Sequence, residues 1–178
     1  MQLLLPARIL QRIRRELKRA GAQEIGGLMM GEHVREGVFR VVDVSVQRSG
    51  GSHTQFVRDP ANHDVQLRSF FARTGQDFTR FNYLGEWHSH PTFEPLPSAV
   101  DIATMQSLVE DPKVGANFLI LLIATLTAGR RIDVSAMAFT PNALPVTVAI
   151  HYEHEHSGVR GLRKLLRYMS EWSRSTKS

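Results

Sequence analysis

The chain has 178 residues, 42% of them hydrophobic, and a formal net charge of +5. That length suits one filled core and is short for two, so we predict a single domain over residues 1–178. The absence of cysteine excludes a disulfide framework, a thiolate zinc site and a cysteine nucleophile. Any metal ion must therefore be held by histidine and carboxylate side chains.

The longest apolar run, Asn117 to Leu126, is about half of the ~20 residues that span a bilayer. The N-terminus lacks the apolar core and small-residue cleavage site of a signal peptide. We therefore expect a cytoplasmic protein with no membrane partner. Arginine and lysine concentrate in two helix-like segments, 8–19 and 160–174, where a solvated polar face is the commoner reason for such charge. Nucleic acid is thus not the favoured partner, and an acidic protein partner stays open.

The sequence pattern in the first half of the chain predicts two helices and a hairpin. Apolar residues recur at helical spacing over Pro6 to Ala20, and a glycine suited to a C-cap follows. Strand-like runs at 27–34 and 38–47 are joined by a short Arg-Glu-Gly turn, which predicts a hairpin. Residues 48–60 read as a surface loop, and Ala61 to Thr74 as a second helix.

The middle of the chain combines a strand, a proline-rich turn and a helix. Asn82 to His90 reads as a strand, and the three prolines within 91–97 forbid regular structure. A helical pattern starts at Ser98 and ends near Asp111, just before a proline. The strand and the helix therefore lie on either side of one short turn.

The last part of the chain predicts three strands, at 118–126, 132–139 and 146–152, and a closing basic amphipathic helix at 159–173. Helices alternating with strands predict an α/β fold in which helices cover the faces of a sheet. The order of the strands within the sheet does not follow from this pattern.

Four side chains around the proline-rich turn have the spacing of a metal site. Residues two apart on a strand share a face, so His88 and His90 can converge on one ion, although such a pair alone is a weak signal. Ser98 sits at an N-cap position and Asp101 in the first turn, which is typical of a capping pair. If the turn folds the helix start back on the strand, Asp101 can also supply a third ligand.

Water activated by a metal needs a general base, and three glutamates are candidates. Glu86 and Glu94 lie close in sequence, and Glu24 is distant. Glu86 shares the predicted strand face with both histidines, so it can approach the metal directly or orient its ligands.

Three motifs resemble those of the JAMM (MPN-plus, JAB-domain) zinc metalloproteases. They are EIGGLMMG at Glu24–Gly31, HSHP at His88–Pro91 and SAVD at Ser98–Asp101. Their order and spacing match a glutamate before a glycine-rich strand, then His-x-His-Pro, then Ser-x-x-Asp. One departure is Glu86, which stands where many eukaryotic members have an aromatic or apolar residue. The resemblance implies a mixed β-sheet flanked by helices, layered as in cytidine deaminases.

The resemblance also implies roles for five residues. His88, His90 and Asp101 would bind one zinc ion per chain. Glu24 would be the base that activates water, and Ser98 would help to hold the oxyanion. The implied substrate is an isopeptide or peptide bond after the C-terminal glycine of a ubiquitin-like protein. Small bacterial members further imply activating and conjugating enzymes of the same operon as partners, including CBASS-type antiphage systems.

Two other classes of metal-binding protein fit the chain less well. His88-x-His90-x-x-x-Glu94 also matches the first motif of cupins, but the second cupin motif is missing and a helix follows instead of strands. A zinc deaminase is excluded because its cysteine ligands are absent. A non-catalytic MPN scaffold remains the main alternative, and it is disfavoured because all five implied residues are present.

A second histidine cluster, His151, His154 and His156, lies near the end of the last predicted strand. His154 and His156 could share a strand face, but the spacing places no third ligand beside them. We expect these histidines to be exposed to solvent.

Overall fold

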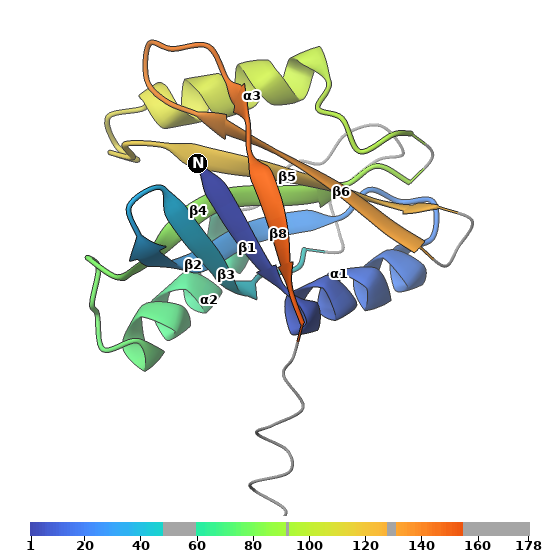
Figure 1. Cartoon of the computed structure of the whole chain (residues 1–178), viewed down its shortest axis with the longest axis horizontal. Coiled ribbons are helices and arrows are strands. Elements are labelled where there is room, and N and C mark those ends of the chain that lie inside the picture. The colour runs from blue at the N-terminus through green and yellow to red at the C-terminus, as the bar shows by residue number, and fades with distance from the viewer. Residues whose placement is uncertain (48–59, 92, 128–130, 155–178) are drawn as a thin grey trace, which may run out of the picture.

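The computed structural model describes residues 1–47, 60–91, 93–127 and 131–154. These residues form three helices and one eight-stranded sheet (Figure 1). None of the helices in these ranges is long and apolar enough to cross a membrane. The helix expected at 159–173 and most of the loop at 48–60 lie outside the described residues.

The elements follow one another as β1 (Gln2–Pro6), α1 (Ala7–Ala20), β2 (Gly26–Arg35), β3 (Val38–Val44), α2 (Pro60–Arg73), β4 (Phe81–Ser89), α3 (Ala99–Glu110), β5 (Leu119–Thr127), β6 (Arg131–Phe139), β7 (Val146–Thr147) and β8 (Ala149–Glu153). Across the sheet the strands lie in the order β7-β6-β5-β4-β2-β3-β1-β8. β4 pairs in parallel with β5, and β1 pairs in parallel with β3 and β8, whereas the other neighbours are antiparallel. The predicted mixed sheet flanked by helices is confirmed.

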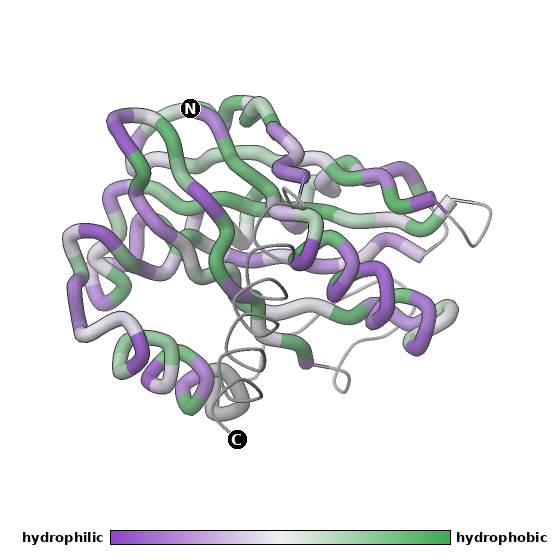
Figure 2. Tube along the Cα trace, turned by 60° about the horizontal axis from the view of Figure 1, so that its bottom comes forward, coloured by the Kyte–Doolittle hydropathy of each residue, from purple (hydrophilic) through white to green (hydrophobic). Residues whose placement is uncertain are grey.

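Opposite faces of β5 pack against different helices. Ile120 and Leu122 belong to the core cluster that contains the apolar face of α1. Leu121 and Ile123 belong to a second cluster with Met105 and Val109 of α3. Because successive side chains of a strand point to opposite faces, α1 and α3 cover the two sides of the sheet, as Figure 1 shows. Hydrophobic residues gather in the strands, and hydrophilic residues recur along the helices (Figure 2).

Most predicted elements are confirmed to within one residue at each end, including β4, α3, β5 and β6. The first strand, β1, was not predicted, although Leu3 and Leu5 on it are fully buried. Its five residues are too few to show a clear period, and its partners are distant in sequence. The run predicted at 38–47 ends as a regular strand at Val44, beyond which Gln47 forms an isolated bridge with Gly26.

The single strand predicted at 146–152 is wrong, because the chain leaves one edge of the sheet for the other within it. β7 pairs with β6, whereas β8 pairs with β1 at the opposite edge. Val148 stands between them, buried, with its N–H donating to the carbonyl of Ala136 at 2.9 Å. Backbone pairing on both sides of this residue therefore splits one apolar run into two strands.

Candidate metal centre

β4 delivers both histidines of the HSHP motif to one face of the sheet. His88 lies in the strand, His90 follows its last residue, and both are buried. Their Nε2 atoms are 3.3 Å apart. Trp87 points to the other face, where its Nε1–H donates to the carbonyl of Ser45 at 2.9 Å. The alternation of a strand thus brings the two histidines together as the sequence predicts.

His90 is fixed through its backbone and its second ring nitrogen. Its N–H donates to the carbonyl of Ala124 at 2.9 Å, and its carbonyl accepts from Thr125 Oγ1 at 2.6 Å. Its Nδ1 lies 3.2 Å from the carbonyl of Glu94. A carbonyl can only accept a hydrogen bond, so this contact places the ring proton on Nδ1 and leaves the Nε2 lone pair for a ligand.

The start of α3 forms a capping box that also carries a carboxylate to the histidines. Ser98 Oγ accepts from the Asp101 N–H at 3.2 Å, and Asp101 Oδ2 accepts from the Ser98 N–H and hydroxyl, each at 2.7 Å. Asp101 Oδ1 lies 3.4 Å from His88 Nε2, and Oδ2 lies 3.7 Å from His90 Nε2. The capping role and the approach to the histidines therefore occur in the same residue.

The donor set of these three side chains fits zinc. Tetrahedral zinc bonds histidine nitrogen and carboxylate oxygen at about 2.0–2.2 Å, which places neighbouring donors about 3.4 Å apart. The separations among His88, His90 and Asp101 are close to that value, and their candidate donor atoms all lie within 4.8 Å of one another. Two imidazoles and a carboxylate could thus hold one ion and leave a position open.

Charge within the cluster acts on the Asp101 carboxyl. Burial on its own would raise the pKa of Asp101, but hydrogen bonds from His88 and from Ser98 outweigh it and hold that pKa well below its usual range. Asp101 is therefore a carboxylate at neutral pH, the form that binds a metal ion.

Glu24 reaches the same cavity from the segment just before β2. It is buried, with 6% of its surface exposed. Burial raises the pKa of Glu24 above its ordinary value, and the nearby Asp101 charge adds to this, while His88 and His90 act in the opposite direction. A carboxylate with a raised pKa is a better proton acceptor, as a general base requires.

The cluster opens into a cavity of about 660 Å³. All three glutamates considered as bases line it, but they differ in setting. Glu94 is exposed, and Glu86 is buried with its Oε1 3.5 Å from the Tyr83 hydroxyl. The lining consists of Glu24, Glu86, His88, His90, Phe93, Glu94, Leu96, Ser98, Val100, Asp101, Thr104, Met105 and Leu121.

The second histidine cluster is not brought together in the described part of the chain. His151 lies exposed on β8, opposite Leu4 of β1, and His154 is exposed just after the strand. His156 lies outside the described residues. Among the described residues, the potential ligands that can meet at one ion are those of the His88 cluster.

Two residues that support the cluster were missed by sequence reasoning. Ser89 accepts from the Ile25 N–H at 3.0 Å, and Thr125 donates to the His90 carbonyl. Both hydroxyl side chains are buried. A buried hydroxyl needs a hydrogen-bond partner, so a serine or threonine within a predicted buried strand was the sequence feature that could have pointed to these two residues.

Comparisons with known proteins show the family of the chain. A family model described as prokaryotic homologs of the JAB domain matches residues 6–139. The chain is 41% identical over 85 residues to the 26S proteasome regulatory subunit RPN11 of Encephalitozoon cuniculi, which is 47% of this chain and 28% of that protein. It is 37% identical over 91 residues to the 26S proteasome non-ATPase regulatory subunit 14 of Dictyostelium discoideum, which is 50% of this chain and 28% of that protein.

A solved structure shows the same fold. The solution structure of protein DSY2949 from Desulfitobacterium hafniense superposes with a TM-score of 0.64 at 18% identity, covering 86% of this chain and 94% of that one. The match to the two proteasome subunits spans little more than a quarter of their length, so it concerns one part of those proteins.

Proposed function

The chain belongs to the family of prokaryotic homologs of the JAB domain, and from this we propose that it is a zinc-dependent isopeptidase or peptidase. Its proposed substrate bond follows the C-terminal glycine of a ubiquitin-like protein, in a conjugate or in a precursor. One observation carries the proposal. The His88, His90 and Asp101 donors and the Glu24 carboxylate, from three separate segments, line one cavity.

In this proposal His88, His90 and Asp101 hold the zinc ion. When bound, zinc supplies Lewis acidity, which polarises a carbonyl group and makes water a stronger acid. The Glu24 carboxylate accepts the proton of the attacking water and returns it to the departing amine. Its buried position and raised pKa suit both transfers.

Ser98 is the proposed donor to the oxyanion that forms from the scissile carbonyl. Its hydroxyl lines the cavity and donates to Asp101 Oδ2 at 2.7 Å. A hydroxyl rotates about a single bond, so Ser98 can exchange this acceptor for the substrate oxygen. The capping box would keep Ser98 in place during that exchange, because its backbone N–H also donates to Asp101.

The cellular partners belong to the same proposal. We place the protein with the activating and conjugating enzymes of a ubiquitin-like system, including operons of the CBASS antiphage type. The support for this context is the resemblance to small bacterial JAB domains.

The test is cleavage of a ubiquitin-like precursor, preferably one encoded beside this gene, followed by intact-mass analysis. Zinc-loaded wild type should cleave just after the terminal glycine, whereas Glu24→Gln should bind zinc and leave the precursor intact. Glu36→Gln, which removes an exposed carboxylate from the β2–β3 turn, is the matched control and should cleave normally. An intact precursor after incubation with zinc-loaded wild type would favour a scaffold without activity.

A further inference from the structure

A second cavity, of about 330 Å³, lies at the C-terminal end of α1, and we call it the α1 cavity. It is lined by Leu17, Lys18, Gly21, Gln23, Ser89, Pro91 and Leu126. Leu17 is part of α1, and Leu126 packs against the core cluster that contains it. Ser89 and His88 are successive residues of β4, so their side chains point to opposite faces of the sheet. The α1 cavity and the histidine cluster therefore lie on opposite faces of β4.

Three residues that line the α1 cavity are covalent neighbours of residues of the candidate metal centre. Gln23 directly precedes Glu24, Ser89 separates the two histidines, and Pro91 follows the second of them. Ser89 Oγ also accepts the N–H of Ile25, the residue that follows Glu24. A molecule bound in the α1 cavity would therefore touch the backbone segments that carry the candidate base and the candidate ligands.

The hydrogen-bond donors of the α1 cavity favour an anion. Lys18 is the only charged residue among the described residues that line it, and none of the described residues pairs with its ammonium group. Ser89 accepts the Ile25 N–H, but its own hydroxyl proton has no acceptor in the described part of the chain. The end of α1 would oppose an anion only weakly, because the carbonyls of Leu17 and Ala20 already accept backbone N–H groups.

The rest of the α1 cavity is apolar and small. Leu17 is buried, and Pro91 and Leu126 are half-buried. The volume lies near the lower end of the ~300–1,000 Å³ that is usual for small-molecule sites. None of the described residues that line it is acidic, whereas carboxylates line the larger cavity on the other face. Size and charge thus fit a small anion with an apolar body.

We propose that the α1 cavity is a regulatory site that binds a small organic carboxylate with a short apolar body. The carboxylate pairs with the Lys18 ammonium group and accepts the Ser89 hydroxyl proton. Ser89 Oγ then becomes a stronger acceptor for the Ile25 N–H, because successive hydrogen bonds polarise one another. Ligand binding therefore fixes the segment that carries Glu24. The inference does not depend on the proposed peptidase activity, since neither contact involves a substrate.

The first test compares hexanoate with hexanol, which has the same apolar body and no charge. Each compound is titrated into the zinc-loaded chain at neutral pH, and the backbone amides of Gln23, Ile25 and Ser89 are followed by NMR. We expect a Kd on the order of 1 mM for hexanoate, as suits so small a ligand. Hexanol should bind at least about fivefold more weakly, because it lacks the charge-assisted hydrogen bond to a partly screened lysine.

Two lysine variants identify the site. Lys18→Met keeps an apolar stem without the charge and should bind hexanoate no more tightly than hexanol. Lys113→Met removes a lysine from the segment between α3 and β5 and should behave as wild type. Both lysines are exposed, so both variants should fold. Equal affinity of wild type for the two compounds, including no detectable binding of either, would overturn the inference. Hexanoate binding that survives Lys18→Met, such as coordination to the zinc ion, would overturn it too.

The second test measures the connection to Glu24. Saturating hexanoate should move the Ile25 amide proton resonance downfield, as a stronger hydrogen bond does, and should leave that of Leu28, which donates to Ser45 Oγ, unchanged. Ser89→Ala should still bind hexanoate through Lys18 but show no downfield shift at Ile25. Hexanoate that binds without this shift, or that shifts both amides equally, would overturn the regulatory role. Both tests give their result whether or not the protein cleaves a precursor, so their failure is distinguishable from failure of the proposed function.

Discussion

Ser89 and Ile25 exchange two hydrogen bonds at the edge of the candidate metal centre. The Ile25 N–H donates to Ser89 Oγ at 3.0 Å, and the Ser89 N–H donates to the Ile25 carbonyl at 2.8 Å. Ser89 separates His88 from His90, and Ile25 directly follows Glu24. This pair therefore holds the candidate base against the candidate ligands.

Replacing Ser89 with alanine should move Glu24 without removing a ligand. The buried Ile25 N–H would lose its side-chain acceptor, at a cost of about 1–3 kcal/mol in the free energy of unfolding. We expect zinc content to stay at one ion per chain while kcat falls at least about tenfold, because a displaced base transfers protons poorly. Urea unfolding, metal analysis and precursor cleavage measure the three effects.

Ser45→Ala is the matched control. Ser45 is fully buried, and its Oγ accepts the N–H of Leu28 at 2.7 Å, on strand β2, which begins just after Ile25. Loss of the Ser45 hydroxyl should lower the free energy of unfolding by a similar amount but leave kcat of the folded, zinc-loaded protein unchanged. If the two variants lose kcat equally, Ser89 acts through general stability and has no positioning role.

His90→Ala should lose zinc and cleavage together. The variant removes one of the three donors, and the remaining His88 and Asp101 cannot hold an ion at the affinity of three ligands. Metal analysis after dialysis against a weak chelator measures the loss. His33→Ala is the control, since His33 is exposed and stacks on Phe39, and it should keep its zinc. Full zinc content in His90→Ala would remove His90 from the ligand set.

The parts of the site that local rules govern could be predicted from the sequence. Strand alternation places His88 and His90 on one face, and the helix-start pattern places Ser98 and Asp101 in a capping box. The approach of Asp101 to the histidines was a conditional prediction, because it depends on the path of the turn between them.

Features set by distant contacts could not be predicted. β1 lies between β3 and β8, and neither partner is adjacent to it in sequence. The separation of β7 from β8 depends on both edges of the sheet, which no local pattern records. The role of Ser89 likewise depends on Ile25, which lies 64 residues away.

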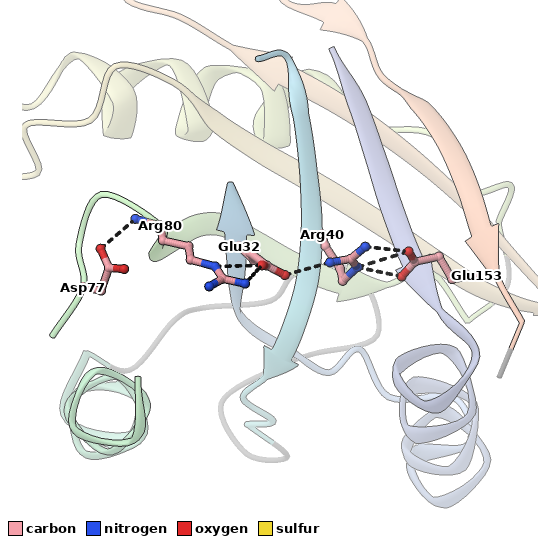
Figure 3. Close-up of polar contacts among 5 residues, drawn as sticks. All are labelled: Glu32, Arg40, Asp77, Arg80 and Glu153. Carbon is pink, nitrogen blue, oxygen red and sulfur yellow. Dashed lines mark hydrogen bonds and ion pairs between the residues drawn. The ribbon is translucent and has the colours of Figure 1, made fainter. Parts of the chain in front are cut away.

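A charged network on the sheet predicts a pH-dependent stability. Figure 3 shows Glu32 of β2 between Arg40 of β3 and Arg80, with Arg40 also pairing with Glu153 of β8. Burial alone would raise the pKa of Glu32, but hydrogen bonds from Arg80 and Arg40 lower it below the ordinary value of 4.5. A carboxyl whose pKa is lower in the folded than in the unfolded protein adds to stability at pH values above its unfolded pKa. This contribution is lost as the pH falls through the folded pKa.

Glu32→Gln should therefore destabilise the protein by about 1 kcal/mol at pH 7, a modest value because Arg80 is largely exposed. The difference from wild type should shrink below about pH 4.5 and vanish once Glu32 is protonated in the folded protein. Urea unfolding over a range of pH measures it. Glu36→Gln on the exposed turn should show no such pH dependence, and an equal dependence in both variants would refute the role of the network.

Gly85→Ala should disrupt the strand that carries the histidines. Gly85 has a φ of +136°, which side chains rarely adopt, and an added Cβ would overlap the backbone of Ile120, its partner on β5. Relief requires β4 and β5 to separate, so we expect a loss of at least about 3 kcal/mol in the free energy of unfolding, together with weaker zinc binding.

Gly75→Ala is the control that separates backbone strain from steric overlap, because Gly75 has a φ of +67° with open space around its Cβ position. It should lose only about 1 kcal/mol and keep its zinc. Equal losses in the two variants, measured by urea unfolding and metal analysis, would show that close packing at Gly85 does not hold β4 in place.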